Sequence, residues 1–250
     1  MSTVWKIFHQ CEVAVANQSR TYRLSNDKEF HFQNWVYERI LDAGYTSSAV
    51  GRNTYPDFPI DNEEDAYEVK GITAGSREKD FDSNSALPSG EHAGKRIYYI
   101  FGRYESVDQG AENPRVLDLV LVDGAFINAG SPFMASNKSL RVLGAFGDIL
   151  LRDRKMYAPY TPYKWLTGLR GSATLIIRAS EEPPSPDFSV VGKFVRVESN
   201  KILVGYRADL KANTLVGEFE DNPSGGQSHE FVAYRSVQAS RNDIVEWIHE

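Results

Sequence analysis

The sequence predicts an α/β protein, in the α+β sense, with a mixed central sheet flanked by helices and a β-rich lobe at its C-terminal end. Three observations lead to this prediction: a helical apolar period in residues 26–42, dense aliphatic runs at 97–104 and 116–122, and four strand-like runs after residue 188. At 250 residues and 41% hydrophobic content, the chain can bury one sizeable core with a subsidiary lobe.

The first elements follow from apolar spacing and end signals. Residues 3–16 fit either a short strand or a helix. Asn26 followed by Glu29 is a capping-box signal, which predicts that a helix begins there and runs to about residue 42. Gly44 follows at the position where glycine commonly ends a helix.

Two short antiparallel strands are expected next. Pro56 disfavours helix at the residue before it, which places Asp57 at the start of a strand. The polar run 61–65 is typical of a turn, and residues 65–72 then form the second strand of the pair.

The middle of the chain is expected to complete the sheet. Residues 97–104 and 116–122 are rich in β-branched and aliphatic side chains and are interpreted as central strands, after a polar loop at 76–95. A helix is predicted near residues 140–151, although glycine at 144 and 147 disfavours it, and residues 174–178 are expected to form another strand.

The proline-rich segment 181–187 is interpreted as a connector between a domain at 1–180 and a lobe at 188–250. This lobe could read DNA, join two subunits or complete the sheet. Its expected elements are strands at 189–197, 202–206, 215–219 and 231–237 and a terminal helix at 242–249 that Asn242 would cap.

Composition excludes several classes of protein. Cys11 is the only cysteine, so neither an intrachain disulfide nor a thiolate zinc cluster can form, and the five histidines lack ligand spacing. No apolar run approaches the roughly 20 residues that cross a bilayer, and the first residues lack the apolar centre of a signal peptide. We therefore expect a cytoplasmic protein without a membrane partner.

The strand at residues 65–72 carries the main chemical signal. Alternation along a strand sends Glu68 and Lys70 to one face and Tyr67 and Val69 to the other. If the preceding strand brings Asp57 alongside, two carboxylates and an amine meet, which suits a divalent cation that takes oxygen ligands. A charged residue alternating with apolar ones is also typical of any half-exposed strand, which is the competing interpretation.

These residues resemble the PD-(D/E)xK nucleases, in which Pro-Asp on one strand is followed by Glu-x-Lys on the next. Here Pro56-Asp57, a gap of ten residues and Glu68-Val69-Lys70 stand in that order, after a helix of similar apolar spacing. The resemblance implies that Asp57, Glu68 and the backbone carbonyl of Val69 bind Mg²⁺. It also implies that Lys70 positions and polarises the attacking water, with Asp57, Glu68 and Lys70 as the catalytic residues.

One position departs from the family pattern. Many members carry a glutamate directly after the helix phenylalanine, whereas this chain has Gln33, which can hydrogen-bond but brings no charge. Glu29, one turn earlier, or Glu38 could take its place, and the site could hold one or two metal ions.

Two further segments are similar to parts of type II restriction enzymes. One is the polar loop before the strand at 97–104, and the other is a basic and aromatic stretch near residue 155. Residues 151–180 hold six cations against one acid, a local charge of +5 in a chain of net charge −6, which suits contact with phosphates. The expected DNA contacts are Asn84, Ser85, Arg152, Arg154, Lys155, Tyr157 and Lys164.

The resemblance implies a type II restriction endonuclease of bacterial or archaeal origin. Such an enzyme makes Mg²⁺-dependent cuts in double-stranded DNA, leaves 5′-phosphate and 3′-hydroxyl ends, and acts as a homodimer at symmetric sites. Two alternatives stay open. One is a repair, recombination or modification-dependent nuclease of the same fold; the other is a non-catalytic DNA-binding or assembly protein in which the charged trio is a surface strand pair.

Overall fold

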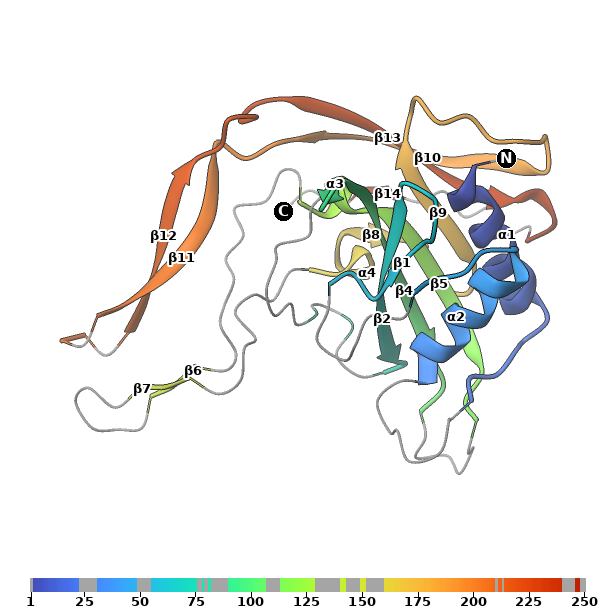
Figure 1. Cartoon of the computed structure of the whole chain (residues 1–250), viewed down its shortest axis with the longest axis horizontal. Coiled ribbons are helices and arrows are strands. Elements are labelled where there is room, and N and C mark those ends of the chain that lie inside the picture. The colour runs from blue at the N-terminus through green and yellow to red at the C-terminus, as the bar shows by residue number, and fades with distance from the viewer. Residues whose placement is uncertain are drawn as a thin grey trace.

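The computed structural model describes residues 2–22, 31–48, 55–75, 78, 81, 90–106, 113–128, 140–142, 149–151, 160–209, 211–212, 214–239 and 246–247. Its centre is an eight-stranded mixed sheet in the order β1-β2-β4-β5-β9-β13-β10, with β3 paired to β4 (Figure 1). The strands of this sheet are β1 (Phe58–Pro59), β2 (Asp65–Thr73), β3 (Glu91–His92), β4 (Lys95–Tyr104), β5 (Val116–Asp123), β9 (Ala173–Arg178), β10 (Phe188–Val197) and β13 (Ser228–Ser236).

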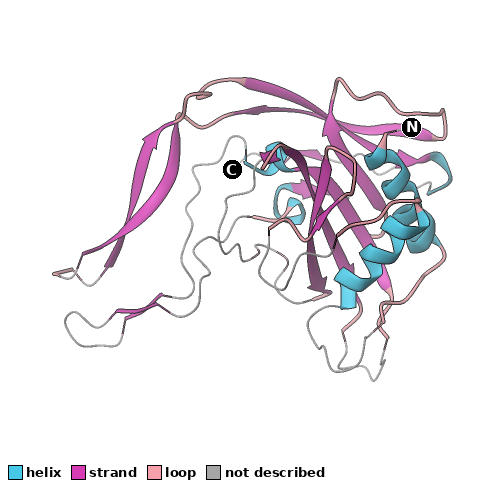
Figure 2. Ribbon diagram, viewed as in Figure 1, coloured by secondary structure: helices cyan, strands magenta, loops and turns pink. Residues whose placement is uncertain are grey.

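Two helices cover one face of the sheet, as Figure 2 shows. They are α1 (Thr3–Ala16), which settles the open choice for this segment as helix, and α2 (His31–Asp42). The expected apolar face of α2 is buried at Phe32, Val36 and Ile40. The helix ends where predicted, because Gly44 adopts a φ of +85° and Tyr45 N donates to the carbonyl of Ile40 at 3.1 Å.

The opposite face is packed with aromatic side chains. Two short helices, α3 (Gly124–Asn128) and α4 (Pro162–Trp165), contribute Phe126 and Trp165 to a second hydrophobic cluster that also contains Tyr99 and Phe101 of β4. Domains are built from two or three packed layers, and here a layer packs on each face of the sheet. The predicted central strands β4 and β5 therefore lie between two cores, which agrees with their continuous apolar sequence.

The strands after the proline-rich segment belong to two structures. β13 pairs with β9 of the central sheet and also with β10. Strands β10 and β13 therefore extend the central sheet and do not form a sheet of their own. The other two, β11 (Lys201–Asp209) and β12 (Thr214–Asp221), form a separate two-stranded ribbon that projects away from the sheet in Figure 1. The four strands predicted in this region are confirmed, and a short 3₁₀ helix, η2 (Val237–Ala239), follows β13.

Two predicted helices are wrong in the described residues. The ends of the segment 140–151 are strands β6 (Leu140–Val142) and β7 (Ile149–Leu151), which pair antiparallel. The segment 242–249 contains strand β14 (Glu246–Trp247), which pairs with β8 (Leu166–Thr167). Two glycines between β6 and β7 disfavour a helix there, and at β14 pairing with a distant strand overrides a local helical preference. In the described chain, no helix combines the length and apolar character that a membrane crossing requires.

Candidate active site

A tight hairpin brings the two acids of the motif together. β1 pairs antiparallel with β2 so that Phe58 lies opposite Tyr67, which sets Asp57 opposite Glu68. The backbone N–H of Asp57 donates to Glu68 Oε2 at 3.2 Å, and the N–H of Val69 donates to Asp57 Oδ2 at 2.8 Å. The two carboxylates are therefore fixed by backbone contacts that depend on the strand register.

Helix α2 provides a third group at this point. Gln33 Nε2 donates to Asp57 Oδ1 at 3.0 Å, so both oxygens of Asp57 have a hydrogen-bond donor. The position at which the sequence departs from the family pattern thus contacts the first acid directly. Glu38 lies farther along the same helix, and its carboxylate pairs with Arg39 at 3.0 Å.

Lys70 completes the cluster from the same strand as Glu68. Its Nζ donates to Glu68 Oε1 at 2.5 Å and lies 5.8 Å from the ring centre of Phe81. Glu68 is buried and Lys70 is half-buried, and register aligns them with Tyr99 and Phe101 of β4 on the aromatic face of the sheet. The expected division of β2 is confirmed, because Tyr67 and Val69 belong to the core under the helices.

The electrostatics of the cluster are those of two like charges held close in a partly dry environment. Burial and the negative charge of Glu68 raise the pKa of Asp57 from 3.8 to about 7, while Lys70 and the Val69 N–H act in the opposite direction. A buried carboxylate pair of this kind is more typical of a functional site than of a surface strand, where solvent would screen both charges.

Close packing of α2 on glycines holds Gln33 in reach of Asp57. The ring of Phe32 lies over Gly102, where an added Cβ would stand 1.9 Å from the ring Cζ. Gly71 of β2 is also close, since a Cβ there would come within 3.0 Å of Phe32 Cβ. A side chain at either position would displace the helix that carries Gln33.

Two tyrosines beside the cluster were not anticipated from the sequence. The hydroxyls of Tyr55 and Tyr99 are 2.9 Å apart, and the negative charges of Glu68 and Asp57 contribute, after burial, to raising the pKa of Tyr99. Tyr55 comes two residues before Asp57 in the chain, so its nearness to the motif is the signal that could have indicated it.

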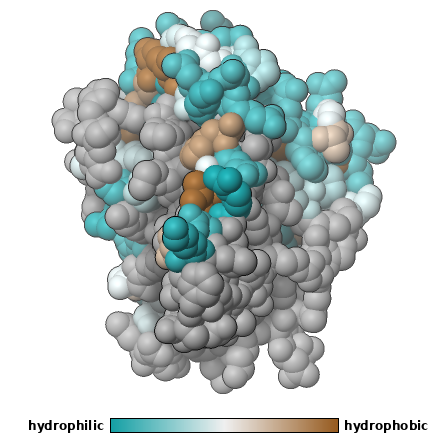
Figure 3. Space-filling model, turned by 90° about the vertical axis from the view of Figure 1, so that its left-hand side faces the viewer, coloured by the Kyte–Doolittle hydropathy of each residue, from teal (hydrophilic) through white to brown (hydrophobic). Residues whose placement is uncertain are grey.

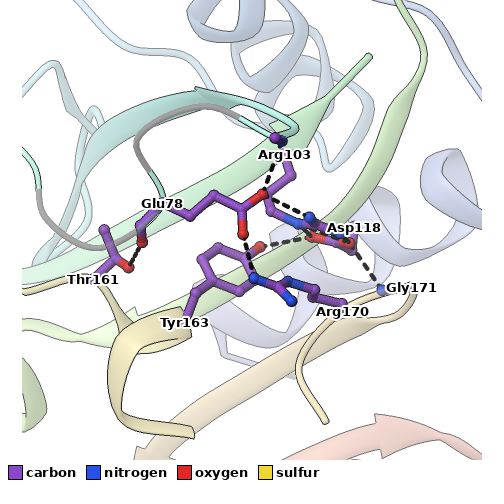
Figure 4. A network of polar contacts seen from close by, with 8 residues as sticks. Glu78, Arg103, Asp118, Thr161, Tyr163, Arg170 and Gly171 are labelled. Atoms are coloured by element: carbon purple, nitrogen blue, oxygen red, sulfur yellow. Dashed lines mark hydrogen bonds and ion pairs between the residues drawn. The ribbon is translucent and has the colours of Figure 1, made fainter. Parts of the chain in front are cut away.

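A polar network next to the site ties three segments together (Figure 4). Arg103 of β4 donates to both oxygens of the fully buried Asp118 at 3.0 and 2.6 Å, and also to Glu78 at 2.8 Å. Tyr163 Oη donates to Asp118 at 2.8 Å, and Arg170 pairs with Glu78 at 2.5 Å. The segment 160–171 is thereby anchored to the central strands through Asp118 and to the chain after β2 through Glu78.

Most of the expected DNA-contact residues lie outside the described part of the chain. Among those described, Lys164 is half-buried with its Nζ 5.7 Å from the ring centre of Tyr160. The basic neighbours Arg170 and Arg178 pair with Glu78 and Asp123. The expected DNA contacts that lie outside the described ranges are Asn84, Ser85, Arg152, Arg154, Lys155 and Tyr157. Glu29, the alternative to Gln33 on the helix, also lies outside them.

The donor set suits Mg²⁺ in its chemistry. Asp57 and Glu68 offer carboxylate oxygens, and a cation between them would offset the repulsion that raises the pKa of Asp57. Within the described ranges no cluster of three or more His, Cys, Asp or Glu side chains is placed to hold a metal.

Comparison with known proteins does not assign the chain to a family. The chain matches no protein-family model, no curated protein and no solved structure.

Proposed function

We propose that the protein is a metal-dependent endodeoxyribonuclease of the type II restriction kind, which cuts double-stranded DNA. The observation that carries this proposal is the convergence of Asp57, Glu68 and Lys70 at one hairpin, with Asp57 held by the N–H of Val69. Two acids that can hold a divalent cation, with an amine beside them, suit metal-assisted hydrolysis of a phosphodiester.

The chain's own groups have separate roles in the reaction. Asp57 and Glu68, with the carbonyl of Val69, would hold Mg²⁺, which when bound supplies positive charge to the scissile phosphate. Lys70 orients the attacking water and stabilises negative charge on the phosphate oxygens. As the water oxygen bonds to phosphorus, the bond to the 3′ oxygen breaks. The water gives up a proton to solvent and the 3′ oxygen takes one, which leaves a 5′-phosphate and a 3′-hydroxyl.

Gln33 is a positioning residue in this scheme. Its amide donates to Asp57 Oδ1 at 3.0 Å, so it orients the carboxylate without adding a third negative charge. Cutting both strands of a symmetric DNA site calls for two such sites related by a two-fold axis, so we propose a homodimer as the active assembly.

The test is incubation of the purified protein with unmodified phage or plasmid DNA, with Mg²⁺ and with EDTA in parallel. Asp57→Ala and Glu68→Ala should abolish cleavage, and Lys70→Ala should slow it severely without weakening binding of the metal. Glu64→Ala is the matched control, because Glu64 is an exposed carboxylate on the same hairpin. Discrete fragments, formed only with Mg²⁺ and lost with the site variants, are the expected result.

Other outcomes separate the alternatives. Intact plasmid together with cleavage of branched or modified DNA would assign the site to repair, recombination or modification-dependent cutting. Absence of cleavage on all of these substrates would leave a DNA-binding or assembly role, and cleavage that survives Asp57→Ala would remove this residue from the mechanism.

A further inference from the structure

Two tyrosine hydroxyls meet beside the acid pair. Tyr55 comes two residues before Asp57 in the chain, and its hydroxyl lies 2.9 Å from that of Tyr99. Register sets Tyr99 of β4 next to Glu68 of β2, and Lys70 follows two residues later along β2 on the same face. A ligand in front of Glu68 therefore has the amine of Lys70 along the strand and the two phenols across the sheet.

Burial decides which of the two hydroxyls donates to the other. Tyr99 is 1% exposed, whereas Tyr55 is half-buried. Among the described residues, the Tyr99 hydroxyl has one hydrogen-bond partner, the hydroxyl of Tyr55. Because a buried donor needs an acceptor, the favoured arrangement has Tyr99 donating to the oxygen of Tyr55. The proton of Tyr55 is then the one in the pair that a ligand can accept.

Neighbouring groups hold this pair in place and keep it protonated. The ring of His92 packs against that of Tyr55, with 5.0 Å between ring centres and an interplanar angle of 79°. Burial raises the pKa of Tyr99, and the neighbouring Tyr55 and the negative charge of Glu68 add to this shift. Tyr99 thus stays a donor. A hydroxyl that accepts a hydrogen bond becomes a stronger donor itself, so Tyr99 strengthens the donor of Tyr55.

The contact that Tyr55 can offer is a hydrogen bond. The other rings on this side of the acid pair, those of Phe81, Tyr99 and Phe101, are buried. Within the described chain, the exposed large hydrophobic side chains lie instead on α1, α2, β10, β12 and η2. From the side on which the ribbon of β11 and β12 projects, apolar patches appear among hydrophilic ones (Figure 3). The buried rings do not suit stacking on a base, whereas a phenol donor suits the oxygens of a phosphate.

We propose that Tyr55 is a substrate-contacting residue whose hydroxyl, oriented by Tyr99, donates a hydrogen bond to a phosphate oxygen of nucleic acid bound at Asp57 and Glu68. This inference rests on the proposed nuclease function. Lys70 supplies positive charge to the phosphate, and the uncharged phenol of Tyr55 adds a directed contact to one oxygen. Tyr99 is a positioning residue, because it acts through Tyr55.

The experiment titrates the full chain with thymidine 5′-monophosphate in the presence of Mg²⁺ and follows the ³¹P resonance of the nucleotide. Tyr55→Phe removes only the hydroxyl, and binding should weaken roughly tenfold to a hundredfold, the range expected for a hydrogen bond to a charged group. Tyr99→Phe should weaken binding less. The double variant should bind no more weakly than Tyr55→Phe alone, because the two hydroxyls act as one unit.

Tyr37→Phe is the matched control. Tyr37 is half-buried on α2, and its ring lies 5.4 Å from that of Phe58, on the side of the same hairpin that faces the core under the helices. This variant should bind the nucleotide like wild type. Thermal unfolding of all variants checks that each keeps the fold.

Three results would overturn the proposal: a wild type that does not bind the nucleotide, a Tyr55→Phe variant that binds it like wild type, or equal weakening by Tyr55→Phe and Tyr37→Phe. Cleavage of DNA, assayed in parallel, separates this proposal from the proposed function. Equal cleavage and equal nucleotide binding by wild type and Tyr55→Phe would keep the nuclease and reject the contact. Weakened nucleotide binding by Tyr55→Phe, in a protein that cuts no DNA, would keep the contact and reject the nuclease.

Discussion

Asp57 is held in a state that costs stability at neutral pH. Its pKa is raised to about 7 by burial and by Glu68, so the folded protein keeps the proton that the unfolded chain loses near pH 4. The protonated Asp57 carboxyl therefore contributes its full share of folding stability below pH 4. This stabilisation is lost as the pH rises through about 7.

Asp57→Asn should therefore gain stability over wild type as the pH rises from 5 to 7, by about 1 kcal/mol per pH unit, and should abolish cleavage. Urea unfolding of both proteins at several pH values without metal measures the difference. Parallel profiles for the two proteins would contradict the raised pKa of Asp57.

Gln33 keeps a third carboxyl group out of the site. Gln33→Glu replaces a donor that lies 3.0 Å from Asp57 Oδ1 by a carboxylate, so the melting temperature without metal should fall. Added Mg²⁺ should restore more of this loss than it adds to wild type. Asn34→Asp, the next position on the same helix, is the control. An equal response of both variants to Mg²⁺ would show that Gln33 does not face the proposed metal position.

At the scale of elements, the packing of α2 against the sheet sets the position of Gln33 next to Asp57. Gly102→Ala should destabilise the protein by about 1–3 kcal/mol, since the added Cβ would overlap the ring of Phe32. The variant should also lose cleavage beyond its loss of folded protein, because Gln33 moves with the helix. In a double-mutant cycle with Phe32→Leu, the double variant should be destabilised by much less than the sum of the two single variants. Destabilisation equal to that sum would argue against the contact between Phe32 and residue 102.

The Arg103 network joins segments that are far apart in the sequence. Asp118→Asn should cost about 2–4 kcal/mol, because it removes the fully buried charge that pairs with Arg103 and leaves this half-buried guanidinium with Glu78 as its remaining charged partner. Arg170→Ala should cost less than about 1 kcal/mol, since the side chain of Arg170 is 65% exposed. Chemical denaturation measures both, and similar costs for the two variants would contradict the difference in burial.

Elements with a strong local pattern could be predicted from the sequence, and those fixed by distant partners could not. The apolar spacing of α2 and the alternation of Tyr67, Glu68, Val69 and Lys70 are local, and the structure has both. Strand β14 exists because Glu246 and Trp247 pair with Thr167 and Leu166, which lie 79 and 81 residues earlier in the chain. No local period indicates such pairing, and the local propensity of this segment favours a helix instead.

The site divides in the same way. Pro56-Asp57 and Glu68-Val69-Lys70 can be identified from spacing, because one hairpin joins them. The contacts from Tyr99 and from the Arg103 network depend on how β4, β5 and the segment 160–171 assemble, which spacing along the chain does not specify.

For the whole molecule, the proline-rich segment 181–187 does not separate two sheets, because strands on both sides of it belong to the same one. β10 and β13 lie on either side of the projecting ribbon in sequence, yet both extend the sheet that contains β2. The proline-rich segment is therefore a connection between strands of one sheet, and the projecting ribbon is the part of the expected lobe that stands apart.

The strand order β9-β13-β10 also determines when each strand finds its partner during translation, because β13 lies between two strands that are both made before it. When β9 has left the ribosome, its partner β13 is still about 50 residues from being made, so one edge of the nascent sheet stays open during that interval. A chain truncated after residue 200 would keep that edge permanently. We expect such a fragment to aggregate when the full-length chain does not, and light scattering during refolding of the two chains would show it.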